Sequence, residues 1–516
     1  MSKQSQNIRV RFAPSPTGPL HIGGVRTALY NFLYARKNGG SFILRIEDTD
    51  QKRFVEGAEK YIIDTLKWCG IEPDEGPGFG GSHGPYKQSE RKDIYRSYIE
   101  KLLDSGHAYY AFDTAEELDE MRSQMKSQGI KSPTYNSITR SYMKNSLTLP
   151  KDDVNRLIQN NFPYTVRIKM PRNLEIKFED QIRGWVSVDS NNVDDKVIAK
   201  SDGMPTYHLA NVVDDYLMGI SHVIRGEEWL PSAPLHVYLY ECLGWRQSIP
   251  QFAHLPLILK PDGNGKLSKR DGDKLGFPVF PLDWHTNQGE KFSGFRERGF
   301  LPEPFLNMLA FLGWNPGTDK EVFSLTELVS DFKLSRVGKS GAKFDFKKTI
   351  WFNQQHIRKK TDLELFDFLI KRDDNLLNTH SKDYILRVIR LIKDRLNFES
   401  DMIKEGECFF SENFKLDSAA VQKKWNKEIT PHILLIQKEI VNLSSFNEDD
   451  IRTGFTNYIE ENKLSFGKVM PMLRIAITGK MAGPSLFETI ELIGKEKFES
   501  RIIRIVNEIE NGKNNS

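Results

Sequence analysis

One short stretch near the N-terminus limits the possible fold more than any other part of this 516-residue chain. Apolar and polar residues alternate over residues 8–12, which predicts a short strand. Residues 13–20 contain three prolines and a glycine, which exclude regular structure. A helical pattern follows at residues 25–33, with His21 just before it. A strand, a tight loop and a helix start direct backbone N–H groups at an anion, so the stretch predicts a nucleotide site.

His21 and Gly23 are the candidate nucleotide contacts of this loop. The imidazole of His21 would lie at the positive end of the helix, where it can donate to a phosphate oxygen. Gly23 has no side chain, so a flat base could approach its backbone closely. A proline-rich loop with a histidine at a helix start also occurs as plain structure. The loop alone therefore does not decide the function.

A second cluster, KLSKR at residues 266–270, follows a turn rich in glycine at residues 262–265. A basic pentapeptide by itself is typical of a solvated loop or a nucleic-acid patch. Together with HIGG at residues 21–24, and in this order, it resembles the HIGH and KMSKS signatures of class I aminoacyl-tRNA synthetases. Gly24 replaces the second histidine, so the role of position 24 is open. Leu267 replaces methionine, which conserves volume.

Further segments narrow the resemblance to the bacterial-type glutamyl-tRNA synthetases. They are RFAPSPTG (11–18), LRIEDTD (44–50), GPYKQSER (84–91), YHLANVVDD (207–215), IRGEEW (224–229) and LRIAITG (473–479). The resemblance implies a glutamate–tRNA ligase of translation. Such an enzyme uses ATP to activate L-glutamate as an adenylate and transfers it to the 3'-terminal adenosine of tRNA(Glu).

The resemblance also assigns roles to individual residues. Arg11 and Arg225 would bind the γ-carboxylate, because a guanidinium offers a carboxylate two parallel donors. Glu47 and Ser15 would bind the ammonium group. The full sets are as follows: catalytic, His21, Lys266 and Lys269; ATP-binding, Ala13, His21, Gly23, Gly24, Lys266, Ser268 and Lys269; glutamate-binding, Arg11, Ser15, Glu47, Tyr207, Asn211 and Arg225; pocket wall, Trp229; anticodon-reading, Arg395.

Some of these residues also have a purely structural interpretation. Arg225 could form a surface ion pair with Glu227 or Glu228, and Tyr207 could be an ordinary core residue. Arg395 could be a solvated arginine at a helix end. Outside the family motifs these interpretations would be preferred, and within them the functional roles are preferred.

The rhythm of strands and helices predicts an α/β fold with a doubly wound, Rossmann-like catalytic domain whose ligand lies at the carboxyl ends of the strands. We expect an inserted α+β domain, in which Val186 and Val188 belong to short strands, and an all-α C-terminal half. In that half the apolar spacing predicts helices over residues 363–370, 384–396, 418–425, 430–443, 449–460, 485–493 and 498–508. The family would use the insertion to grip the tRNA acceptor end and the helices to read the anticodon. The expected domains are residues 1–94 (catalytic, first half), 95–200 (insertion), 201–258 (catalytic, second half), 259–340 (KLSKR loop and stem contacts) and 341–516 (anticodon-binding helices).

Composition limits partners and cofactors. The formal net charge is +3, so contacts with tRNA must come from local clusters of Lys and Arg. Three scattered cysteines give no disulfide framework and suit a reducing compartment. Some relatives bind zinc in the insertion, but the stretch at residues 107–112 offers His107 and no cysteine, so we predict ATP and Mg²⁺ without zinc. With no signal peptide or apolar span, we expect a cytoplasmic monomer with no membrane contact.

Several alternatives remain open at this point. The enzyme could be non-discriminating and also charge tRNA(Gln) with glutamate. A glutaminyl-tRNA synthetase would have β-barrels in place of the helical half, and a truncated relative that glutamylates a modified base would lack that half. A non-catalytic tRNA-binding descendant is disfavoured because His21, Lys266 and Lys269 are present.

Overall fold

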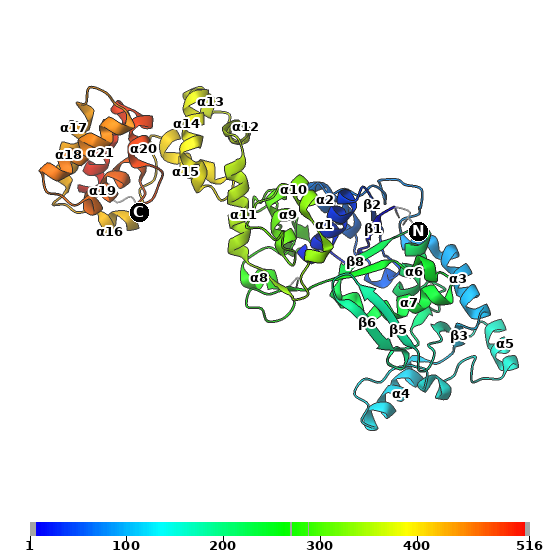
Figure 1. Ribbon diagram of the computed structural model, residues 1–516. Helices are drawn as coiled ribbons and strands as arrows, with labels where there is room; N and C mark the ends of the chain where they lie inside the picture. The colour runs from blue at the N-terminus through cyan, green and yellow to red at the C-terminus, as the bar shows by residue number, and fades with distance from the viewer. Residues whose placement is uncertain (1–6, 269–270, 287, 511–516) are drawn as a thin grey trace. The chain divides into compact units, whose positions relative to one another are not determined.

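The computed structural model describes residues 7–268, 271–286 and 288–510. These residues form two compact units that meet in sequence between Phe346 and Lys347. Each unit is considered by itself (Figure 1).

A six-stranded sheet is the centre of the first unit. Its strand order is β2-β1-β8-β9-β5-β6, with every neighbouring pair parallel except the β5–β6 hairpin. The strands are β1 (Arg9–Phe12), β2 (Ser41–Leu44), β5 (Glu175–Asp180), β6 (Gly184–Asp189), β8 (His222–Gly226) and β9 (Gln251–Leu255). The predicted α/β class with a parallel sheet is confirmed.

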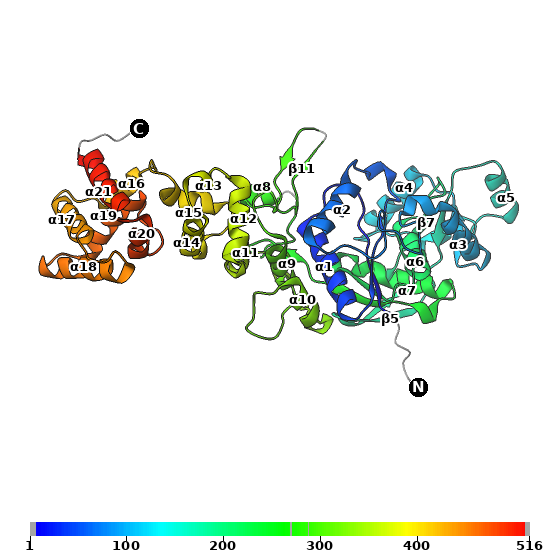
Figure 2. The ribbon, with the colours of Figure 1, turned by 90° about the horizontal axis from the view of Figure 1, so that it is seen from above.

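Helices cover both faces of this sheet, as a doubly wound fold requires. Figures 1 and 2 show α1 and α2 on one side of the strands and α6 and α7 on the other. Helix α1 packs on β1, β2 and β8, while α7 packs on β5. The helices are α1 (Ile22–Lys37), α2 (Ala58–Cys69), α6 (Tyr207–Leu217) and α7 (Ala233–Cys242).

The stretch predicted as an insertion is divided between two sheets. An antiparallel sheet of its own has the order β3-β4-β7 and is accompanied by three helices. These elements are β3 (Ala108–Ala111), β4 (Thr165–Ile168), β7 (Val197–Ala199), α3 (Lys92–Asp104), α4 (Ala115–Ser127) and α5 (Lys151–Gln159). Val186 and Val188 lie in β6, which extends the main sheet. The reason is that β5 pairs with both β6 and β9 and so joins the hairpin to the parallel strands.

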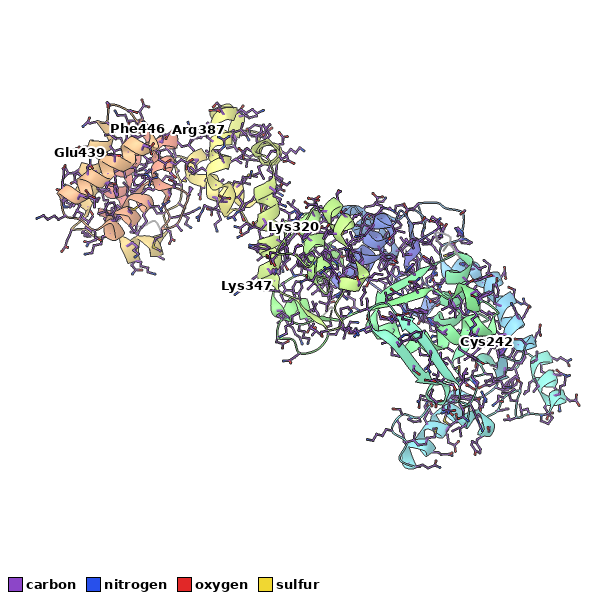
Figure 3. All side chains as sticks on the ribbon, in the orientation of Figure 1. Cys242, Lys320, Lys347, Arg387, Glu439 and Phe446 are labelled. Atoms are coloured by element: carbon purple, nitrogen blue, oxygen red, sulfur yellow. The ribbon has the colours of Figure 1, made fainter. Side chains whose placement is uncertain are left out.

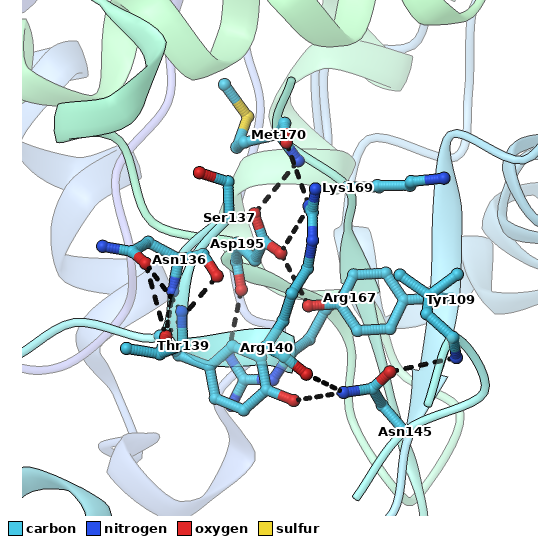
Figure 4. A network of polar contacts seen from close by, with 12 residues as sticks. Tyr109, Asn136, Ser137, Thr139, Arg140, Asn145, Arg167, Lys169, Met170 and Asp195 are labelled. Carbon is cyan, nitrogen blue, oxygen red and sulfur yellow. Dashed lines mark hydrogen bonds and ion pairs between the residues drawn. The ribbon is translucent and has the colours of Figure 1, made fainter. Parts of the chain in front are cut away.

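A buried carboxylate organises the inserted sheet. Asp195 accepts hydrogen bonds from the Tyr109 hydroxyl at 2.7 Å, from the Arg140 guanidinium at 3.0 Å and from the Met170 backbone N–H at 3.0 Å (Figure 4). Asn145 donates to the carbonyl oxygen of Arg140 at 2.7 Å and thereby extends the network. Strand β3 and the irregular segment between α4 and α5 are therefore fixed through one side chain.

The stretch after the main sheet mixes short strands and helices within the same compact unit. Helices α9 and α10 pack on α1, and β10 pairs in parallel with β13. The elements are β10 (Ile258–Leu259), α8 (Asp271–Leu275), β11 (Trp284–His285), β12 (Lys291–Phe292), α9 (Pro302–Phe311), α10 (Leu325–Asp331) and β13 (Ala342–Lys343).

The second unit is helical, as predicted. The sequence pattern correctly predicts α12 (Asp362–Arg372), α14 (Lys382–Ile392), α16 (Ser418–Lys424), α17 (Thr430–Val441), α18 (Glu448–Glu461), α20 (Leu486–Ile493) and α21 (Lys495–Glu510). Four helices were not predicted: α11 (Phe346–Lys359), which begins at the end of the first unit, α13 (Leu376–Thr379), α15 (Asp401–Phe410) and α19 (Phe466–Thr478). In the described part of the chain, no helix combines the length and hydropathy needed to span a membrane.

Candidate functional site

The loop between β1 and α1 forms one wall of a cavity of about 420 Å³. His21 is the N-cap of α1, and its Nδ1 accepts the backbone N–H of Gly23 at 3.1 Å. Because Nδ1 is an acceptor, the proton of the neutral ring lies on Nε2. The predicted role as a donor at a helix start is therefore compatible with the local geometry, although the ring also serves as a helix cap.

Most of the predicted site residues line this one cavity, although they come from four separated segments. The lining includes Arg11, Ala13, Ser15, His21, Gly23, Gly24, Glu47, Tyr207, Asn211, Arg225 and Trp229. The segments converge because β1, β2 and β8 end at the same edge of the parallel sheet and α6 begins beside it. Ser15, Glu47, Tyr207 and Trp229 also line an adjoining cavity of about 80 Å³.

A cluster of buried charges adjoins the cavity through Arg11 and Glu47, which line it. Arg11 binds both carboxylate oxygens of Asp215, at 3.0 and 3.3 Å. Arg45, which is fully buried, donates to Asp215 at 2.7 Å and to Glu47 at 2.9 Å. Arg91 and Asp214 form a further pair at 2.7 Å. The guanidiniums of this cluster are thus matched by carboxylates, as buried charges require.

Arg225 lies on β8 at the same cavity, but its partners are neutral. Its guanidinium donates to the Tyr207 hydroxyl at 2.9 Å, to His254 Nε2 at 3.1 Å and to the carbonyl oxygen of Trp229 at 3.3 Å, and its Nη1 also lies 3.4 Å from Nδ1 of His236. The side chain is 5% exposed and has no carboxylate within ion-pair distance among the described residues. A buried guanidinium without a counterion favours an anionic ligand at this point.

The alternative interpretation of Arg225 as a surface ion pair is wrong. Glu227 pairs with Arg183, and Glu228 pairs with Lys266 at 2.8 Å. Arg225 itself is buried, because β8 lies between β1 and β9 inside the sheet.

Glu47 is a carboxylate of this cluster that lines both cavities. It accepts hydrogen bonds from Arg45 and, at 3.1 Å, from Asn211. Burial raises the pKa of Glu47 despite the opposing effect of Arg45. A cation in the cavity would lower that pKa and favour the ionised form. Ser15 is exposed to the same cavity, so the two predicted ammonium contacts lie at one place.

Aromatic side chains close the cavity. The rings of Tyr207 and Trp229 lie with their centroids 4.5 Å apart, and Trp229 is 41% exposed. Tyr207 is more than a core residue, because its hydroxyl accepts the hydrogen bond from Arg225. Burial raises the pKa of this hydroxyl, which keeps it protonated.

The first residues of the KLSKR motif, Lys266 and Leu267, lie close to the start of α1. Lys266 lines a small cavity that also includes His21, Gly23 and Glu228, and it is exposed. Leu267 is buried, which accounts for an apolar residue within a basic loop. The structure places Ser268 outside these cavities, bonded through its N–H and hydroxyl to Asp271 at 2.8 and 2.6 Å. Lys269 lies outside the described residues.

Gly24 lies against the end of the Leu20 side chain. A Cβ at this position would lie 2.4 Å from Cδ1 of Leu20. The end of the Leu20 side chain therefore occupies the space that a Cβ would need at the last position of the HIGG motif.

The described residues contain no group of three His, Cys, Asp or Glu side chains that could hold a metal ion. The three cysteines are unbonded and lie in separate elements; Cys242, at the end of α7, is labelled in Figure 3. The expectation of a zinc-free protein stays a prediction.

Arg395 lies in the helical unit, in a short 3₁₀ turn after α14. It forms an ion pair with Glu405 at 3.1 Å and donates to the carbonyl oxygen of Gly483 at 3.2 Å. The residue is therefore tied to its own unit rather than fully solvated, and its predicted anticodon role stays a prediction.

Three further charged residues support the site from within the same motifs, although none of them was predicted to have a role in the site. Arg45 and Asp215 hold Arg11 and Glu47, and Glu228 binds Lys266. Their charge could have indicated a role in the site, because each is a charged residue close to apolar residues within its motif.

Comparisons with known proteins agree with this geometry. Residues 7–351 match the family described as tRNA synthetases class I (E and Q), catalytic domain, and residues 363–506 match an anticodon binding domain. A glutamate–tRNA ligase of Amoebophilus asiaticus is 52% identical over 496 residues, which cover 96% of this chain and 97% of the relative. One of Cytophaga hutchinsonii is 53% identical over 504 residues, or 97% of this chain and 98% of the relative.

A solved structure is similar over the same length. The crystal structure of a glutamate–tRNA ligase from Elizabethkingia meningosepticum in complex with its amino acid superposes with a TM-score of 0.88 and 47% identity. The match covers 97% of this chain and 99% of that one.

Proposed function

Since the chain belongs to the class I glutamate–tRNA ligases, we propose that it attaches L-glutamate to tRNA(Glu) at the expense of ATP, and that the cavity beside α1 is its active site. The proposal rests above all on Arg225, a buried guanidinium that faces the cavity without a carboxylate partner among the described residues. The γ-carboxylate of glutamate is the counterion that this position needs.

The charges that line the two cavities favour one orientation of the bound glutamate. Its γ-carboxylate would bind Arg225 and Tyr207, with Arg11 nearby on β1. Its ammonium group would lie between Glu47 and Ser15, in the adjoining small cavity. This orientation directs the α-carboxylate toward the loop of His21 and the N-terminus of α1.

The reaction takes place in two substitutions. An oxygen of the α-carboxylate attacks the α-phosphorus of ATP, the bond to the β-phosphate breaks, and pyrophosphate leaves. A ribose hydroxyl of the terminal adenosine of the tRNA then attacks the activated carbonyl carbon, and AMP leaves with the bonding electrons. Both steps require positioning and stabilisation of charge on phosphate oxygens rather than a nucleophile from the protein.

His21 and Lys266 are suited to that stabilisation. The Nε2–H of His21 and the N-terminus of α1 would hold phosphate oxygens, and Gly23 would lie against the adenine. Lys266 would exchange its partner Glu228 for the leaving phosphates. We include Lys269 in the same role on the basis of its motif. Ala13, Gly24 and Ser268 would complete the ATP site.

Mg²⁺ would enter with the nucleotide. The described residues form no cage of three ligands, and Mg²⁺ commonly keeps its waters and binds substrate phosphates with few protein ligands. The ion would add positive charge to the phosphates, while zinc has no role in the proposal.

The proposed roles of the domains also rest on the membership of the chain in this family. Residues 1–94 and 201–258 would form the catalytic domain, 95–200 the acceptor-binding insertion, 259–340 the stem-contact region, and 341–516 the anticodon-binding helices with Arg395 among the readers. We propose a monomer that works in the cytoplasm.

The test is the charging of a tRNA(Glu) transcript by the purified chain with ATP, Mg²⁺ and either labelled glutamate or labelled glutamine. Glutamate is expected to form a base-labile ester with the tRNA, and glutamine is not. Preference for glutamine, or no ester with either amino acid, would refute the proposal.

A further inference from the structure

Three side chains on adjacent strands connect the pocket to the far part of the sheet. Arg225 lies on β8, His254 on β9 and Asp180 at the end of β5. Arg225 and His254 are directly opposite each other in the β8–β9 register. Their side chains form a continuous chain of hydrogen bonds that begins at the cavity and ends at a fully buried carboxylate.

The chemistry of arginine fixes the direction of these hydrogen bonds. A guanidinium can only donate, so His254 Nε2 must accept the bond from Arg225 Nε at 3.1 Å. The proton of the neutral ring is then on Nδ1, which donates to Asp180 Oδ2 at 2.6 Å. A protonated ring would place an N–H against the guanidinium, and the other neutral tautomer would do the same.

The surroundings support a neutral histidine beside an ionised aspartate. Burial lowers the pKa of His254, against the opposing hydrogen bond to Asp180. Burial opposes the charge of Asp180, yet the bonds from His254 and from backbone N–H groups hold its pKa below its usual value. Both side chains have an exposed fraction of 0%.

The backbone also fixes Asp180 itself. Its Oδ1 accepts the N–H of Ile182 at 3.0 Å and that of Arg183 at 2.8 Å. Its Oδ2 accepts the N–H of His254 at 3.1 Å in addition to the ring. One carboxylate oxygen of Asp180 therefore accepts hydrogen bonds from the β5–β6 turn, and the other accepts hydrogen bonds from His254.

We propose that Asp180 and His254 are positioning residues for glutamate selection: Asp180 sets the tautomer of His254, and the Nε2 lone pair of His254 holds the Arg225 guanidinium toward the substrate carboxylate. Neither residue touches the substrate. The proposal rests on the proposed function, because it requires Arg225 to bind the γ-carboxylate of glutamate.

An amide at position 180 would disturb this arrangement in a defined way. In Asp180→Asn, the two N–H groups of the turn retain the amide oxygen, so the NH₂ group faces both Nδ1 and the backbone N–H of His254. The ring would then accept at Nδ1 and carry its proton on Nε2, where it opposes the Nε–H of Arg225. A comparable exchange of Asp for Asn in the serine protease triad leaves the geometry intact and imposes the wrong tautomer.

The variant His254→Gln distinguishes an effect of the His254 tautomer from an effect on the fold. Its carbonyl oxygen can take the place of Nε2 and accept from Arg225, and an amide has no tautomer to set. His254→Gln should therefore retain most of the function, and it should also suppress the effect of Asp180→Asn.

The experiment measures kcat and KM for glutamate in tRNA(Glu) charging at saturating ATP, and the KM for ATP at saturating glutamate, for five proteins: the unmodified chain, Asp180→Asn, His254→Gln, the double variant and Glu179→Gln. Glu179 is the matched control, because it precedes Asp180 on β5 but is exposed. We expect the KM for glutamate to rise about 10- to 100-fold in Asp180→Asn with the KM for ATP unchanged, and to stay within about threefold of the unmodified value in the other variants.

Two outcomes would overturn the proposal. In the first, Asp180→Asn leaves the KM for glutamate unchanged. In the second, Asp180→Asn raises that KM by the same factor in the double variant with His254→Gln as it does alone, which would mean that Asp180 acts through the fold and not through the tautomer of His254. If Asp180→Asn does not fold by circular dichroism, His254→Phe replaces it, because phenylalanine supplies an aromatic ring without either nitrogen. A normal KM in His254→Phe would equally refute the proposal.

Failure of the proposed function would look different. In that case the unmodified chain itself would not charge tRNA(Glu) with glutamate. Normal charging by the unmodified chain together with unaffected variants would refute the positioning roles alone.

Discussion

Arg11 and Arg225 line the same cavity in opposite electrostatic situations. Arg11 binds Asp215 through two hydrogen bonds, whereas the partners of Arg225 are a hydroxyl, two histidines and a carbonyl oxygen. The charge of Arg11 is therefore already matched, and that of Arg225 awaits a ligand. Arg225 should contribute more to the selection of an acidic substrate than Arg11 does.

Removal of this charge should abolish efficient charging with glutamate. In Arg225→Gln the kcat/KM for glutamate is expected to fall roughly 10²- to 10³-fold, because a buried charge-assisted contact is worth about 3–4 kcal/mol. Steady-state charging kinetics check this, with Arg246→Gln as the control, because Arg246 is an exposed arginine elsewhere on the same unit. Unchanged kcat/KM in Arg225→Gln would remove Arg225 from the substrate site.

Lys266 should act on the reaction and not on tRNA binding. Its Nζ lies 2.8 Å from Glu228 and is largely exposed, so the side chain supports little of the fold. Lys266→Ala is expected to lower kcat roughly 10²-fold or more, which is typical for loss of one group that stabilises transition-state charge. The Kd for tRNA, measured by filter binding, should change less than about threefold. A variant that charges tRNA normally would contradict the role of Lys266.

His21 has two functions that substitution can separate. As N-cap of α1 it accepts the Gly23 N–H, and loss of such a cap costs about 1 kcal/mol. His21→Asn should retain the cap and the Tm but lower kcat, since asparagine caps well and cannot place a donor where Nε2 lies. His21→Ala should lower both. Equal kcat in His21→Asn and the unmodified chain would mean that the ring serves the helix alone.

Glu75 gives a test of stability against pH. The hydrogen bond from Arg9, with others from Tyr86 and His83, lowers the pKa of Glu75 from 4.5 to about 2. Because the pKa is lower in the folded state, this stabilisation is present above pH 4.5 and is lost as pH falls toward 2. Glu75→Gln should cost about 1–2 kcal/mol at pH 7, as measured by urea unfolding.

The difference between Glu75→Gln and the unmodified chain should shrink steadily below pH 4.5. Glu72→Gln is a suitable control, because Glu72 is an exposed carboxylate three residues away. A difference that stays constant from pH 7 to pH 3 would show that the ionised form of Glu75 makes no specific contribution.

The sequence could predict the cavity residues because they lie within contiguous motifs. Each motif ends a strand or begins a helix of the parallel sheet, so their convergence follows from the fold class. Contacts between motifs were not predictable. The bond from Arg225 to His254 spans 29 positions in sequence, and the one from His254 to Asp180 spans 74, and neither distance carries a local pattern.

The missed elements have similar causes. Pro471 inside α19 and Gly406 inside α15 are residues that normally argue against a helix interior, and packing within the helical unit overrides them. The hairpin of β5 and β6 alternates like any two-stranded ribbon. Its attachment to the main sheet depends on the pairing of Asp180 with Phe252, which is a long-range contact.

The most direct test of the account is the charging of separate tRNA(Glu) and tRNA(Gln) transcripts with labelled glutamate, ATP and Mg²⁺. The account predicts that tRNA(Glu) is charged. Charging of tRNA(Gln) as well would keep the chemistry and show a non-discriminating enzyme, in which Arg395 does not exclude the glutamine anticodon. Charging of neither transcript would contradict the central claim that this chain is a glutamate–tRNA ligase.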